Sequence, residues 1–127
     1  MDYNIQVMED QGFINVITAG EWVKEKDDSL VREIMETVLR TGIRKVLLDM
    51  RELHFDFPLF TIFQRAQDLR EQRMEYNTFS MKVALVYSAK DEKTKDDFSF
   101  FETTAQNRGL PYRVFQQMET ALEWLTK

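Results

Sequence analysis

The chain has 127 residues, a formal net charge of −5 and no cysteine. This length suits one domain with a single core spanning residues 1–127, and the lack of cysteine excludes disulfides, thiolate nucleophiles and cysteine-bound zinc. An acidic surface repels polyanions, so nucleic acid is not an expected partner. The apolar runs are short and the N-terminus has no signal-peptide pattern, so we expect a cytoplasmic protein without a transmembrane segment.

The first elements form a predicted antiparallel hairpin. Apolar and polar residues alternate over 3–7, which is typical of a strand near the edge of a sheet. A turn follows over 9–12, where Gly12 supplies a positive φ, and a second strand is predicted over 13–19. Gly20 ends that strand.

A helical period begins near residue 27 and continues to residue 40. Asp27, Asp28 and Ser29 are all suitable N-caps, and Gly42 supplies the stop in a left-handed conformation. The apolar stripe that we expect to face the core consists of Leu30, Val31, Ile34, Met35, Val38 and Leu39.

A continuous apolar run at 46–48 predicts a central strand that is covered on both faces and closes at Asp49. A loop over 50–57 leads to a second predicted helix at about 58–75. Arginines alternate with acidic residues along this helix, a pattern that favours local ion pairs. Its expected inward stripe is Leu59, Ile62, Phe63, Ala66 and Leu69.

The remainder alternates strand and helix. Strands are predicted over 82–87 and 112–115, and helices over about 90–107 and from Met118 almost to the end. The order ββαβαβαβα predicts an α/β domain with a mostly parallel sheet of about five strands, an N-terminal antiparallel hairpin and four helices.

Residues that could carry catalysis are few. Asp49 and Asp56 bracket the loop after the central strand, and we favour structural caps over a cation or acid/base site. The single histidine, His54, has no nucleophile pattern beside it, and we interpret it as an exposed loop residue. The four glycines are isolated, so no phosphate-binding loop is expected. We therefore expect no catalytic residue, metal or cofactor.

Four phenylalanines fall within nine residues: Phe55, Phe57, Phe60 and Phe63. One helical stripe cannot turn all of these rings inward, because Phe60 lies at its margin and two of the rings precede the helix. Two interpretations remain open. Either all the rings pack into the core under the loop, or some lie at a surface or at the mouth of a pocket.

Three segments resemble a known family. They are Gly20-Glu21, the run 45–50 followed by Leu53 and Phe55-Asp56, and the C-terminal segment 114–125. Together they resemble the STAS fold, and more closely the SpoIIAA-like (STAS/SEC14-type) relatives of the bacterial anti-sigma factor antagonists. The resemblance covers almost the whole chain and implies a single SpoIIAA-like domain. None of these segments is a catalytic signature.

The chain departs from that family at its switch. In the antagonists a serine follows the residue that Asp56 matches, and its phosphorylation controls partner binding. Here Phe57-Pro58-Leu59 replace the serine, and Thr61 is the nearest hydroxyl. The resemblance therefore implies a module that has lost the phosphorylation switch.

The sequence thus predicts a non-catalytic binding or regulatory module. We favour protein–protein contact, or self-association as a homodimer, through the Phe-rich segment. The alternative is a pocket near residues 55–63 for an apolar, lipid-like small molecule. The candidate binding residues are Phe55, Asp56, Phe57, Phe60 and Thr61.

Overall fold

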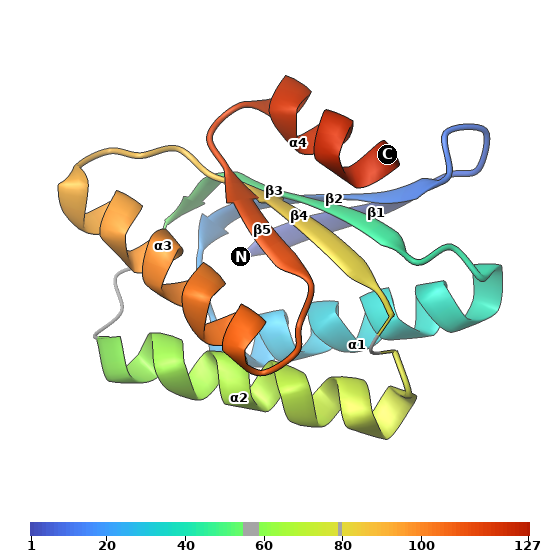
Figure 1. Cartoon of the computed structure of the whole chain (residues 1–127), viewed down its shortest axis with the longest axis horizontal. Coiled ribbons are helices and arrows are strands. Elements are labelled where there is room, and N and C mark those ends of the chain that lie inside the picture. The colour runs from blue at the N-terminus through green and yellow to red at the C-terminus, as the bar shows by residue number, and fades with distance from the viewer. Residues whose placement is uncertain (55–58, 79) are drawn as a thin grey trace.

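The computed structural model of the chain describes residues 1–54, 59–78 and 80–127, without the side chains of residues 59 and 60. Five strands and four helices follow one another in the predicted order (Figure 1). They are β1 (Asp2–Met8), β2 (Phe13–Glu21), α1 (Lys24–Thr41), β3 (Lys45–His54), α2 (Leu59–Tyr76), β4 (Lys82–Val86), α3 (Glu92–Asn107), β5 (Tyr112–Phe115) and α4 (Met118–Thr126).

The strands form one sheet in the order β1-β2-β3-β4-β5. The first pair is antiparallel and the other three pairs are parallel, which confirms the predicted hairpin and sheet. Parallel strands added in one direction through right-handed crossovers carry their helices on one face. Accordingly, α1, α2 and α3 lie on one side of the sheet and α4 lies on the other (Figure 1).

The sheet is buried on both faces along its centre. Val46 and Val83 face the core shared with α1, α2 and α3, whereas Leu47 and Ala84 pack with Ala121 of α4. This two-sided burial explains why β3 begins with an unbroken apolar run instead of alternating residues. Within the described residues, no helix has the length and apolar character needed to cross a membrane.

Helix α1 begins earlier than predicted. It starts at Lys24 after Val23, whose apolar side chain offers no cap. Asp27 and Asp28 lie inside the helix, where both pair with Arg65. The predicted stop is confirmed, since Gly42 caps the helix with φ 75°. Leu39, expected in the inward stripe, is 51% exposed, so that part of the prediction is wrong.

Strand β3 continues beyond its predicted end. Asp49 does not close the strand, and Met50 to His54 belong to it instead of to a loop. Ile17 pairs with Asp49 and Ala19 pairs with Glu52, so β3 carries one extra residue at this point. Such a bulge bends a strand and redirects the side chains that follow it. The Thr18 hydroxyl donates to the Asp49 carbonyl at 2.9 Å within the bulge.

Helix α2 follows the predicted stripe only in part. Ile62, Ala66 and Leu69 are buried, but Phe63 is 44% exposed beneath the guanidinium of Arg108, whose Cζ lies 4.3 Å from the ring centroid. The predicted local ion pairs are also wrong for Arg65 and Arg73. Arg65 reaches α1, and Arg73 is fully buried and donates to the Met81 carbonyl at 2.7 Å.

Candidate functional site

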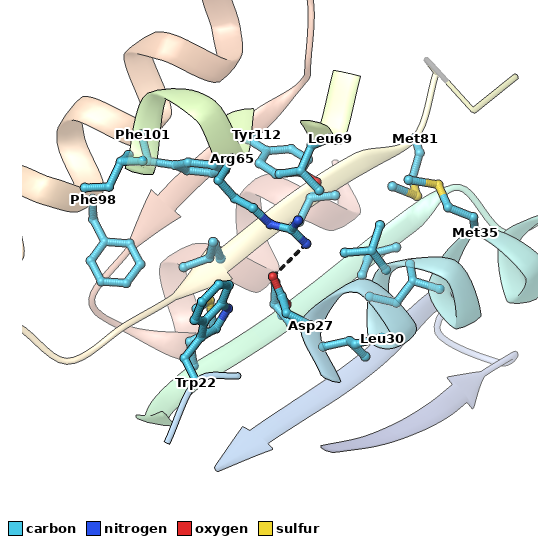
Figure 2. Close-up of a pocket in the computed structure, with 18 of the residues that line it drawn as sticks. Trp22, Asp27, Leu30, Met35, Arg65, Leu69, Met81, Phe98, Phe101 and Tyr112 are labelled. Atoms are coloured by element: carbon cyan, nitrogen blue, oxygen red, sulfur yellow. Dashed lines mark ion pairs between the residues drawn. The ribbon is translucent and has the colours of Figure 1, made fainter. Parts of the chain in front are cut away.

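A cavity of ≈ 110 Å³ lies between the sheet and the three helices on one of its faces. Its floor is formed by β3, β4 and β5, and its walls come from α1, α2 and α3 (Figure 2). The lining is mostly aliphatic and aromatic, and includes Leu48, Leu69, Leu85, Phe101 and Tyr112. Apolar space with few polar groups is typical of small-molecule sites in proteins.

The cavity arises where the inner face of α2 meets α1 and α3. Ile62, Arg65 and Leu69, at i, i+3 and i+7, bring one face of α2 to the cavity. Arg65 does not fill the space over the sheet, because its guanidinium is held toward α1. Figure 2 shows this side chain reaching toward Asp27, with the ring of Trp22 also on the cavity wall.

An ion pair between Arg65 and α1 interrupts the apolar lining. Arg65 Nη1 donates to Asp28 Oδ1 at 2.8 Å, and Nη2 lies 2.7 Å from Asp27 Oδ2. The second contact is an ion pair without a well-directed hydrogen bond, since Nη2 is buried and has no hydrogen-bond partner among the described residues. Its N–H groups can therefore donate to an acceptor on a ligand in the cavity.

The ionisation states of Arg65 and Asp28 are set by the charged groups beside them. Burial lowers the pKa of Arg65, but Asp27 and Asp28 outweigh burial and the pKa is raised. Burial raises the pKa of Asp28, but hydrogen bonds from Lys24 and Arg65 outweigh burial and the pKa is lowered. Arg65 and Asp28 therefore stay ionised at neutral pH and are poorly suited to donate or accept protons.

The predicted site residues lie mostly beyond what the structure describes. Phe55, Asp56 and Phe57 fall outside the described residues, as does the side chain of Phe60. Thr61 is half-buried and does not line the cavity, whereas its neighbour Ile62 does. The assignment of these five residues to a binding site stays a prediction.

Sequence reasoning missed the residues that give the cavity its character. Trp22 follows Gly20-Glu21 and has no predicted role, and Arg65 is predicted only to form local ion pairs along its helix. A signal for Arg65 was present, because it lies between the buried positions Ile62 and Ala66 on one helical face.

The other candidate residues lie away from the cavity. Asp49 lies within β3, and both of its carboxylate oxygens accept from the Arg51 side chain, at 2.9 and 2.8 Å, which occupies them against a cation. His54, the last residue of β3, is exposed, and its Nδ1 lies 2.6 Å from Lys90 Nζ. Within 1–54, 59–78 and 80–127, no three His, Cys, Asp or Glu residues gather in a way that could hold a metal ion.

Comparison with solved structures supports the architecture. The chain is similar to an uncharacterized protein of the DUF3478 family with a SpoIIAA-like fold, from Shewanella loihica PV-4. The match has a TM-score of 0.58 and 15% sequence identity, and covers 98% of this chain and 92% of that one. No family model matches the chain, and no curated protein matches it. The fold is therefore SpoIIAA-like, as the sequence resemblance predicts, and at this identity the likeness concerns the fold alone.

Proposed function

We propose that the chain is a non-catalytic binding domain whose ligand is a small apolar molecule, or the apolar part of a larger one, held in the cavity. The observation that carries this proposal is the apolar cavity of ≈ 110 Å³ beneath α1, α2 and α3. Of the two binding roles that the sequence left open, this cavity favours the small molecule.

The size of the cavity limits the ligand. An engineered apolar cavity of ~150 Å³ binds benzene, so the space here suits a single ring or a short alkyl chain. It is smaller than the ~300 Å³ typical of sites for drug-sized molecules. An apolar ligand that enters this space leaves water, which stabilises the complex by about 25 cal/mol per Å² of apolar surface buried.

The lining chemistry supports binding over catalysis. Asp27 and Arg65 are paired with each other, and Asp97 accepts from Lys93 at 2.8 Å. A general base or nucleophile needs a substrate-facing group that is not neutralised in this way. The proposed domain also acts without a phosphorylation switch, since Phe57-Pro58 stand where the antagonists carry serine.

The experiment is thermal unfolding in the presence of hexanol. A ligand at ten times its Kd adds about 1.4 kcal/mol, which should raise the Tm by about 3–6 °C in a domain of this size. Val31, which is half-buried and lines the cavity, provides the blocking variant. We expect Val31→Phe to fill the space and abolish the increase in Tm.

The matched control lies on the same helix. Leu39→Phe also introduces a phenyl ring into α1, but at a side chain that is 51% exposed. This variant should keep the response of the wild type. An equal response in wild type and Val31→Phe would place hexanol elsewhere, and no response in the wild type would contradict the proposed function.

A second candidate is self-association through α2. Phe63 and Met74 are 44% and 54% exposed. They are eleven residues apart, which brings them to within about 20° of each other around the helix axis. Two large apolar side chains on one exposed helix face favour contact with another protein surface.

A further inference from the structure

A polar groove adjoins the apolar cavity. It has a volume of ≈ 250 Å³ and lies where β3 and β4 end and α3 begins. Met50, Asp97 and Phe98 line both spaces, so the cavity and the groove share one wall. Ligands of open α/β sheets bind outside the carboxyl ends of the strands, which is the edge that this groove occupies.

Most of the charged groups in the groove already have partners. The Arg51 guanidinium is held by Asp49, and Lys93 Nζ lies 2.8 Å from Asp97. Asp91 accepts from the backbone N–H and the hydroxyl of Thr94, both at 2.8 Å, and so caps α3. These groups shape the groove but have much of their charge compensated.

Lys90 differs from its neighbours. Its Nζ lies 2.6 Å from His54 Nδ1, and no carboxylate of the described residues lies within ion-pair distance of it. An ammonium group can only donate, so Nδ1 accepts and the neutral imidazole carries its proton on Nε2. His54 thus takes up one N–H of the Lys90 ammonium, and its own Nε2–H points away from Lys90. The two remaining N–H groups of the ammonium can donate to a carboxylate or phosphate group.

We propose that the ligand is an anionic amphiphile, with its apolar part in the cavity and its carboxylate or phosphate in the groove at Lys90. This inference rests on the proposed function and adds the head group to it. The two spaces adjoin at Met50 and Phe98, and the proposed ligand passes between these side chains. An apolar body with one charged end matches this division.

The fluorescence of Trp22 reports on the cavity directly. The chain has two tryptophans, and Trp124 packs against Phe115 in the α4 cluster, away from the cavity. In a Trp124→Phe background, we would titrate hexanol, hexanoate and hexyl phosphate. Hexanol measures the apolar contact alone, and the two anions show which head group the groove favours. At least one anion should bind about fivefold to tenfold more tightly than hexanol.

Variants at Lys90 separate the head group from the cavity. In Lys90→Met, the affinity for the anion should fall to within about twofold of the affinity for hexanol, which should stay unchanged. Lys90→Arg should keep most of the tighter binding of the anion. Lys95→Met is the matched control, because it removes the same charge from an exposed position of α3 outside the groove. It should bind all three probes like the wild type.

Each remaining outcome decides between the two proposals. If hexanol binds as tightly as both anions, the head-group inference is wrong and the proposed function stands. If Lys95→Met weakens anion binding as much as Lys90→Met does, general charge attraction explains the preference and the site is wrong. If no probe changes Trp22 fluorescence, the proposed function itself fails.

Discussion

At the scale of single residues, the arginines of α2 show how tertiary contacts override a surface pattern. Arg73 is fully buried, donates to the Met81 carbonyl at 2.7 Å and lies with Cζ 4.9 Å from the centroid of the Tyr112 ring. Its Nε and Nη2 have no hydrogen-bond partner among the described residues. Among the described residues, the buried charge is stabilised by backbone carbonyls and an aromatic face instead of by a carboxylate.

Asp49 and Arg51 give a prediction that depends on pH. Burial raises the pKa of Asp49, but the hydrogen bonds from Arg51 outweigh burial and hold the pKa below its ordinary value of 3.8. Because the folded pKa is the lower one, the stabilisation is complete above 3.8 and is lost as the pH falls through the folded value. Asp49→Asn should therefore lower the free energy of unfolding by about 1–2 kcal/mol at neutral pH.

Urea unfolding at pH 7, at pH 5 and near pH 3 measures this effect. The difference between wild type and Asp49→Asn should be equal at the two higher values and smaller at the lowest. Asp10→Asn, in the exposed turn between β1 and β2, provides the charge-matched control and should have little effect. A difference that does not change with pH would show that the ion pair is not the source of the stabilisation.

The alternation of charges along α2 did not predict the partners of its arginines, although the helical period places Arg65 on the buried face. Arg65 and Arg73 alternate with acids along the chain, which favours pairing within the helix, but their partners lie in α1 and in the loop before β4. Contacts of this kind depend on how elements meet, which a helical period does not encode. Thr61, by contrast, was correctly placed on a helix, yet its role stays untested.

At the scale of elements, apolar periodicity predicted every strand and helix, and polar strand residues caused the largest error. Residues 51–54 read as a loop because three of the four are polar, yet they extend β3. The bulge that follows Asp49 makes this extension hard to predict, since an extra residue lets the strand continue while its side chains reorient. The groove at the carboxyl edge was missed for the same reason.

The prediction on self-association concerns the exposed face of α2 that contains Phe63 and Met74. If α2 mediates a dimer, Phe63→Ser together with Met74→Ser should convert it to a monomer, because two large apolar side chains leave the interface. Light scattering at tens of micromolar measures the mass of both proteins. A wild type that is monomeric at this concentration, or a variant of unchanged mass, would rule out this face as the interface.

At the scale of the whole molecule, strand order explains where the cavity lies. Because each parallel strand is added on the same side of the last, three crossover helices cover one face, and α2 meets α1 and α3 above the sheet (Figure 1). The sequence predicted this architecture, but it could not predict the space left inside it. A cavity depends on packing differences of a few methylene groups, which element patterns do not resolve.

The crystal structure of the protein with hexanoate tests the central claim most directly. Our account predicts electron density for the alkyl chain in the cavity among Leu48, Leu69 and Phe101, with the carboxylate directed toward Lys90. Density for hexanoate only outside the cavity, with the cavity itself empty, would contradict the account.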